Sequence, residues 1–152
     1  MSRISIAAIL LATAIGAHAQ TAAVAVQGAW VRATVEGQTS SGAYMTLTAK
    51  EPMVLTGVST PVAGTAEVHE MKMDGDVMRM NAVDSLPLPA GKAVELKPGS
   101  YHIMLMQLKA PLQPNTSVPL TLQVRTANGS RGEVNLSVPV VSAAPSASGH
   151  HH

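Results

Sequence analysis

Short stretches in which apolar and polar residues alternate run through most of this chain, and they limit what it can fold into. The stretches are rich in Val, Thr, Leu and Tyr, and they cover residues 29–35, 43–49, 53–58, 66–72, 77–82, 93–96, 101–107, 118–125 and 133–138. Alternation with a period of two is typical of strands that bury one face. We find no apolar stripe with the 3.6-residue period of a helix, so we expect an all-β fold.

Turn-forming residue pairs separate these stretches. They are Glu51-Pro52, Asp74-Gly75, Pro98-Gly99, Pro114-Asn115 and Asn128-Gly129. Pro presets the backbone angle φ, and Gly or Asn tolerates a positive φ, so such pairs favour turns. About eight or nine short strands at this spacing predict an antiparallel β-sandwich or small barrel. The length of 152 residues suits a single domain.

The two ends of the chain depart from this pattern. Residues 1–19 have a positive start, an apolar run and the small residues Ala17 and Ala19 at the end, which is typical of a secretory signal peptide. The run is shorter than the ~20 apolar residues that span a bilayer, which disfavours a retained membrane anchor. Residues 141–152 are of low complexity, which predicts a disordered tail. Residues 20–140 remain as the expected folded domain.

The composition excludes several kinds of site and partner. The chain has no Cys, so it cannot form a disulfide, a thiolate metal site, an iron–sulfur cluster or a cysteine nucleophile. Removal of the signal with Arg3 leaves nine of the ten Lys and Arg, which balance the nine Asp and Glu. No basic run remains that would follow a phosphate backbone or an anionic membrane. We therefore expect no nucleic-acid binding and no stable membrane insertion.

Sulfur and imidazole gather in one part of the sequence. The nine Met residues are the only sulfur in the chain, and a thioether is a soft, neutral donor that cannot be deprotonated. Six of the Met residues lie between Met71 and Met106. The only two His residues of the expected domain, His69 and His102, lie in the same region.

Asp74 and Gly75 predict a β-hairpin in the middle of this region, because Asp-Gly is a strong hairpin signal. If these two residues form the whole loop of a type I′ turn, His69 lies directly opposite Met80. The two Cβ atoms would then be about 5 Å apart on one face of the hairpin. The pairing depends on the loop, since a shift of one residue would place the side chains on opposite faces.

The stretch from Tyr101 to Gln107 supplies the other half of the candidate site. Alternation places His102, Met104 and Met106 on one face of this strand. If the strand lies beside His69, two imidazoles and two thioethers converge. These donors are neutral and soft and suit monovalent copper, whereas zinc favours thiolate or carboxylate.

The same residues have an ordinary structural explanation. Met on a strand usually fills gaps in the core, and a lone His is usually a hydrogen-bonded structural residue. The chain has no Phe, so some Met must pack the core, and we expect this of Met45 and Met53. A core position or a soft rim around the metal is expected for Met71, Met73, Met78 and Met106. Spacing alone leaves open whether the quartet of His69, Met80, His102 and Met104 binds metal.

The quartet also carries a resemblance to a known family. Ten residues separate His69 from Met80, twenty-one separate Met80 from His102, and one separates His102 from Met104. This spacing is similar to the H-x10-M-x21-H-x-M signature of the periplasmic copper chaperone family PCuAC. Similar local sequence surrounds it, and the likeness runs from Trp30 to Val138.

The resemblance implies a cupredoxin-like Greek-key β fold that binds Cu(I) through the two His and two Met residues of the quartet. It implies a periplasmic carrier that delivers copper to an acceptor protein, such as cytochrome c oxidase subunit II during assembly of its copper centre, or another copper chaperone. Copper acquisition, tolerance or storage is the alternative role.

The end of the chain and its single Trp have less specific interpretations. The tail ends in His150, His151 and His152, which form either a secondary Cu(II) site or an unstructured end without a role. Trp30 shares a strand face with Arg32, which favours a core or cation–π role.

Other functional classes have less support. We find no nucleophile, carboxylate pair or hydrolytic metal triad, and a Met-ligated ion is a poor Lewis acid, so we do not expect an enzyme. Electron transfer by a blue-copper site is disfavoured because the chain has no Cys. A structural β-sandwich in which His and Met only pack remains the second alternative.

Overall fold

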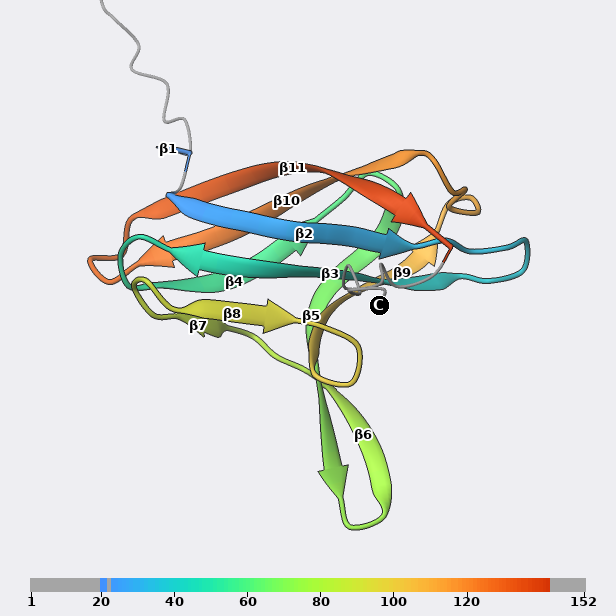
Figure 1. Ribbon diagram of the computed structural model, residues 1–152, viewed down its shortest axis with the longest axis horizontal. Coiled ribbons are helices and arrows are strands. Elements are labelled where there is room, and N and C mark those ends of the chain that lie inside the picture. Colours follow the sequence, from blue (N-terminus) through green and yellow to red (C-terminus); the bar gives the residue numbers. More distant parts are fainter. Residues whose placement is uncertain (1–19, 22, 143–152) are drawn as a thin grey trace, which may run out of the picture.

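Eleven strands make up the protein in its computed structural model, which describes residues 20–21 and 23–142 (Figure 1). In chain order they are β1 (Gln20–Thr21), β2 (Val24–Arg32), β3 (Ser40–Ala49), β4 (Met53–Ser59), β5 (Ala63–Asp74), β6 (Val77–Ala82), β7 (Leu86–Leu88), β8 (Ala93–Leu96), β9 (Tyr101–Leu108), β10 (Ser117–Thr126) and β11 (Arg131–Val141). No helix long and apolar enough to cross a bilayer occurs in these residues. The expected signal peptide and the histidines His150, His151 and His152 lie outside them.

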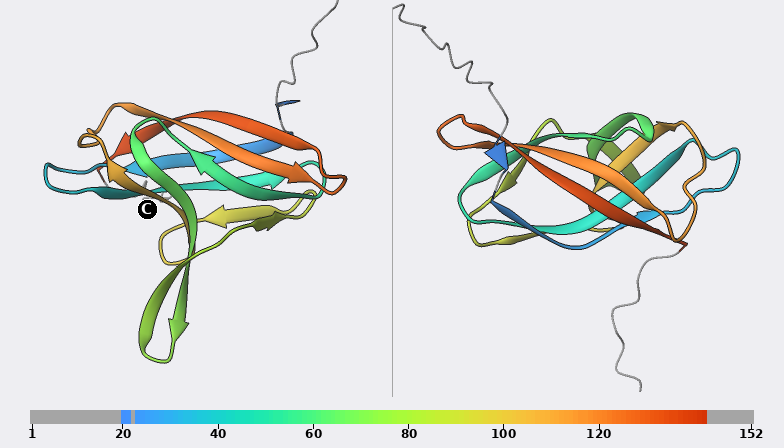
Figure 2. Two further views of the ribbon diagram at one scale, coloured as in Figure 1. Left: turned by 180° about the vertical axis from the view of Figure 1, so that it is seen from behind. Right: turned by 90° about the horizontal axis from the view of Figure 1, so that it is seen from above.

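The strands form two packed layers that are joined through β11. Hydrogen-bonded neighbours follow the order β6-β5-β9-β3-β2-β11-β10-β4-β7, with β1 beside β11 and β8 beside β3. β11 is antiparallel to β10 along most of its length, but it pairs with β2 only at Val140 and Val141, in parallel. The end of β11 therefore connects the layer of β10 with the layer of β2 (Figure 2). The expected all-β, cupredoxin-like Greek-key sandwich is confirmed.

The core lies between the two layers and follows from the alternation in the sequence. On β10, Val118, Leu120 and Leu122 are buried, and their neighbours are more exposed. Burial of such a side chain contributes roughly 1.5–3 kcal/mol relative to leaving it exposed, which holds the strand in register. Met45 and Met53, which are 3% and 4% exposed, fill gaps in the same core, so their predicted role is confirmed.

β9 presents different residues to its two faces. Ile103 and Leu105 are fully buried in the core. His102 and Met104 alternate with them and therefore lie on the opposite face of the sheet, as predicted. His102 is nevertheless only 4% exposed. Its imidazole is thus shielded from solvent, although it lies outside the core.

β5 and β6 form a hairpin that projects from the sandwich (Figures 1 and 2). The first part of β5 pairs with β9, and its last part pairs with β6. Every residue of β6 is exposed. The end of the hairpin is therefore held by pairing between its own two strands and not by the core.

The hairpin loop differs from the prediction, which was wrong by one position. The loop consists of Gly75 and Asp76, because Asp74 already pairs with Val77. A type I′ turn over Asp74 and Gly75 needs a positive φ at both residues, whereas a type II′ turn needs it only at a first-position Gly. Gly75 has φ 64°, and Asp76 is not among the residues with positive φ. Each predicted cross-strand pair is consequently shifted by two residues.

Candidate metal centre

Two histidines meet on neighbouring strands of the outer face. His69 of β5 lies directly opposite His102 of β9. Their ring centroids are 5.9 Å apart, and the ring planes are inclined by 56°. The expectation that the strand of His102 lies beside His69 is confirmed. Neutral imidazoles at this separation can offer one nitrogen each to a shared ion.

Met104 extends the same face by one step along β9. It lies opposite Glu67 on β5 and opposite Gly42 on β3. A Cβ at Gly42 would stand 2.5 Å from the hydroxyl oxygen of Tyr44, so the tyrosine side chain occupies the space above this glycine. The Tyr44 and His102 ring centroids are 6.2 Å apart. The tyrosine therefore flanks the half-buried Met104 on the side away from β5.

Met80 lies farther from the histidines than the sequence predicted. Ala82 takes the position opposite His69, and Met80 lies opposite Met71. The predicted direct pairing of His69 with Met80 is thus wrong. A shift of two residues keeps Met80 on the same face, as a diagonal neighbour with a typical separation of about 7–8 Å, which is within reach of long side chains. Met80 is 44% exposed.

The hydrogen bonds of the two histidines show which nitrogens carry protons. The Nε2 of His69 donates to Oε2 of Glu67 at 2.9 Å. The Nδ1 of His69 is buried and has no hydrogen-bond partner among the described residues. The Nδ1 of His102 donates to the carbonyl oxygen of Ser100 at 3.3 Å. These assignments follow from the acceptors, since neither a carboxylate nor a carbonyl oxygen donates. In its neutral form each ring therefore has one lone-pair nitrogen, Nδ1 in His69 and Nε2 in His102.

The environment of His102 favours its neutral form. Burial lowers the pKa of His102 below its usual value of 6.5, and the neighbouring His69 lowers the pKa further. The hydrogen bond to the carbonyl of Ser100 opposes this change. A metal ligand must be neutral imidazole, so burial keeps His102 in the form that binds metal at lower pH than an exposed histidine.

An aromatic row continues from the histidines across the sheet. Tyr44 of β3 lies beside Trp30 of β2, with ring centroids 4.5 Å apart. The guanidinium of Arg32 lies over the indole at 5.7 Å, and Trp30 is 7% exposed. The predicted core or cation–π role of Trp30 is confirmed. The row forms a wall on the β3 side of His102.

A comparison with known protein families gives a match along nearly the whole described chain. Residues 24–140 match the family described as "Putative lipoprotein LpqE-like". The chain belongs to the LpqE-like, PCuAC-type family. The resemblance noted in the sequence is thus confirmed.

Relatives of this LpqE-like chain include proteins of known structure. It is 34% identical over 122 residues to "Putative lipoprotein Lxx21020" of Leifsonia xyli subsp. xyli, covering 80% of this chain and 71% of the relative. It is 30% identical to Cu(I)-bound DR1885 from Deinococcus radiodurans, with a TM-score of 0.60 and coverage of 86% and 85%. The copper-bound PCuAC domain from PmoF2 shares the fold, with 23% identity, a TM-score of 0.63 and coverage of 83% and 99%.

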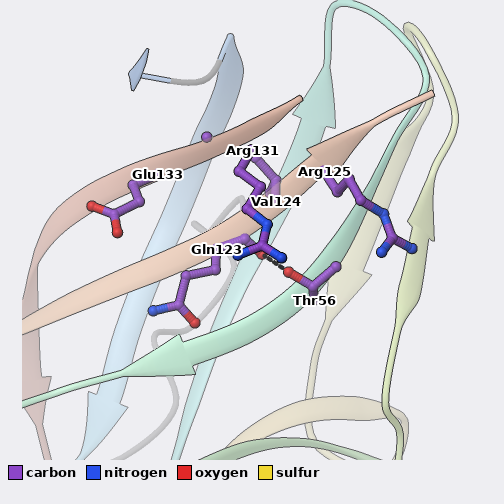
Figure 3. Close-up of a pocket in the computed structure, with 7 residues that line it drawn as sticks. Thr56, Gln123, Val124, Arg125, Arg131 and Glu133 are labelled. Carbon is purple, nitrogen blue, oxygen red and sulfur yellow. Dashed lines mark hydrogen bonds between the residues drawn. The ribbon is translucent and has the colours of Figure 1, made fainter. Parts of the chain in front are cut away.

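A hollow of about 460 Å³ lies elsewhere on the LpqE-like domain, on β4, β10 and β11 (Figure 3). It is lined by Thr56, Gln123, Val124, Arg125, Arg131, Gly132 and Glu133. This lining has no His or Met, and its oxygen and guanidinium groups do not suit a soft monovalent ion. Among the described residues, no three His, Cys, Asp or Glu side chains cluster as metal ligands.

Three residues that shape the centre were missed by the sequence interpretation. Glu67 holds the ring of His69, Ser100 holds the ring of His102, and Tyr44 covers Gly42. The sequence contains a partial signal for Glu67, because it precedes His69 by two residues and so shares its strand face. No comparable signal exists for Tyr44, since its role depends on the pairing of β3 with β9.

Proposed function

We propose that this protein is a metallochaperone that binds one Cu(I) ion and passes it to an acceptor protein. The proposed ligands are His69, Met80, His102 and Met104. The observation that carries the proposal is the buried Nδ1 of His69, which lies beside His102 and has no hydrogen-bond partner in the described part of the chain. An unsatisfied buried polar atom costs about 1–3 kcal/mol, and a metal ion bound at this nitrogen would remove that cost.

The chemistry of the donors selects the ion. All four ligands are neutral, and two of them are thioethers, which favours Cu(I) over zinc or the harder divalent ions. The carboxylate of Glu67 accepts a hydrogen bond from Nε2 of His69 and so orients the ring. Two structural relatives, Cu(I)-bound DR1885 and the copper-bound PCuAC domain from PmoF2, support copper as the cargo.

Transfer follows from the absence of a thiolate among the ligands. An acceptor with thiolate or additional imidazole ligands displaces the thioethers and imidazoles one at a time, and the copper passes in the direction of higher affinity. No covalent bond of a substrate is made or broken, so the protein is a carrier and not an enzyme. The acceptor we propose is cytochrome c oxidase subunit II or a second copper chaperone in the periplasm, after removal of residues 1–19. Copper acquisition, tolerance or storage would use the same centre.

A competition titration with a chromophoric Cu(I) chelator tests the centre. The His102→Ala and Met104→Leu variants should both bind Cu(I) more weakly than the wild type, with the larger loss for His102→Ala. Met106→Leu is the matched control, because Met106 lies on the same face of β9 but is not a proposed ligand. Unchanged affinity in both ligand variants would disprove the assignment of the centre. Failure of the wild type to bind equimolar Cu(I) would favour a structural β-sandwich.

A transfer experiment tests the carrier role separately. Copper-loaded protein is mixed with the apo form of a candidate acceptor, and the NMR signals of both proteins are followed. Movement of the ion to the acceptor, with return of the His102 and Met104 signals to their metal-free positions, supports delivery. Retention of copper against every thiolate acceptor would support storage instead.

A further inference from the structure

The hairpin of β5 and β6 carries an unusual row of sulfur. Met71 lies directly opposite Met80, and Met73 lies directly opposite Met78. Directly opposed residues of an antiparallel pair share one face, and so do residues two apart on a strand. All four thioethers therefore lie on the same face of the hairpin, which we call the sulfur face.

The sulfur face is not part of the core. Met73, Met78 and Met80 are 60%, 47% and 44% exposed, and the hairpin stands away from the sandwich (Figures 1 and 2). Two roles were predicted for Met73 and Met78, a core position or a soft rim around the metal. Their exposure excludes the core position. Gap filling, the usual reason for Met in a β protein, does not explain these positions.

The opposite face of the hairpin is charged. Lys72 pairs with Arg79 there, and Nε of Arg79 forms a salt bridge with Asp74 at 2.8 Å. The two faces thus separate thioethers from charged groups, with no charged side chain between the Met residues. A soft monovalent ion on the sulfur face would meet neutral sulfur donors only.

We propose that Met71, Met73 and Met78 form a second Cu(I) site, made of thioethers alone, from which the ion passes through Met80 to the histidine centre. The second site rests on the proposed function for the identity of its cargo. It is weaker than the histidine centre because it has only thioethers and is open to solvent. The same features allow it to take up and release the ion more readily.

The path along the hairpin is continuous in the register. The Met73–Met78 pair lies nearest the turn, the Met71–Met80 pair lies next, and His69 follows two residues from Met71 on the same face. At each step one Cu–S bond replaces another, or a Cu–N bond replaces a Cu–S bond. The ion stays monovalent throughout, and no proton or electron is transferred. Met80 connects the two sites, because it is the cross-strand partner of Met71 and a proposed ligand of the first centre.

NMR of the full chain, with ¹³C-labelled methionine methyl groups, tests the second site. The probe is Ag(I), which has the charge and soft character of Cu(I) but is not oxidised in air. The first equivalent should shift the methyl signals of Met80 and Met104. The second equivalent should shift those of Met73 and Met78, with Met71 following. The methyl signals of the buried Met45 and Met53 should stay in place.

Two variants distinguish the two sites. Met73→Leu with Met78→Leu keeps the apolar volume but removes the sulfur, and should abolish the second step while leaving the first unchanged. Val77→Leu is the matched control, since Val77 is 57% exposed on the charged face of the same hairpin. It should retain both steps. His102→Ala should lose the first step and keep the shifts at Met73 and Met78.

The outcomes separate the second site from the first. Suppose that the first equivalent of Ag(I) shifts the methyl signals of Met80 and Met104, but further Ag(I) up to saturation does not shift those of Met73 and Met78. The second site is then wrong and the proposed function stands. The same result would follow if the second ion binds only at His150, His151 and His152, or if the sulfur face only contacts a protein partner. If the methyl signals of Met73 and Met78 shift while those of Met80 and Met104 do not, the proposed centre is wrong.

Discussion

The sandwich and the hairpin contribute to the candidate metal centre in different ways. His102 and Met104 lie on β9, whose other face is fixed by the fully buried Ile103 and Leu105. The sulfur face of the hairpin has no core behind it, and every residue of β6 is exposed. One region therefore holds its donors in place, whereas the other can move them.

This difference suits the two requirements of a carrier. Imidazoles with fixed hydrogen-bond partners hold an ion with little reorganisation. Exposed thioethers on long, flexible side chains adapt to an ion that enters or leaves. The junction lies at His69, where β5 pairs with β9 on one side and with β6 on the other.

The largest contrast should be in stability. Leu105→Ala removes a fully buried side chain of β9 and should lower the free energy of unfolding by about 2–5 kcal/mol. Met73→Ala changes a side chain that is 60% exposed and should change it by about 0.5 kcal/mol or less. Urea denaturation of the metal-free variants measures both values. A cost at Met73 equal to that at Leu105 would show that the hairpin packs against the core in solution.

The next effect concerns Glu67, which holds His69 at the junction of the two regions. Glu67→Ala removes the acceptor that holds Nε2 of His69 and should weaken Cu(I) binding by about 10–100-fold, the usual cost of losing a group that orients a ligand. Glu67→Gln keeps a carbonyl acceptor and should recover part of the affinity. Chelator competition measures all three proteins.

Glu70→Ala is the matched control for this experiment. Glu70 follows His69 directly and therefore lies on the other face of β5. Its removal should leave the copper affinity unchanged. Equal losses for Glu67→Ala and Glu70→Ala would mean that net charge, and not the hydrogen bond to His69, determines the effect.

The sequence predicts the sandwich part of the centre well. A period of two is strict in a strand, so the positions of His102 and Met104 opposite to Ile103 and Leu105 follow from their numbers alone. The burial of Met45 and Met53 follows in the same way. The pairing of β5 with β9, which brings His69 to His102, is a long-range contact that local sequence does not determine.

The hairpin part is less predictable because the glycine has two possible places in the loop. Gly75 can stand second, after Asp74, or first, before Asp76, and both choices give a two-residue turn. The structure has the second arrangement, in which only the glycine takes a positive φ. The shift by two residues preserved the face of Met80 but changed its neighbour from His69 to Met71. A period-two pattern thus predicts faces correctly even where it does not predict pairs.

The smallest effect should come from the aromatic wall. Gly42→Ala places a Cβ where the hydroxyl of Tyr44 now lies. Because the hydroxyl is the far end of a rotatable side chain, the ring should swing aside at a cost of about 0.5–1.5 kcal/mol in unfolding free energy. The displaced ring no longer flanks Met104, so the NMR signals of His102 and Met104 should shift and copper affinity should fall. Thermal unfolding and chelator competition measure the two effects.

Gly57→Ala separates the loss of the wall from a general steric cost. A Cβ at Gly57 would also collide with a flexible side chain, the amide of Gln123, but this contact lies between β4 and β10, away from the histidines. It should cost a similar amount of stability and leave the signals of His102 unchanged. If both variants weaken copper binding equally, Tyr44 has no specific part in the centre. If only Gly42→Ala does, the sandwich contributes to the site through Tyr44 as well as through its ligands.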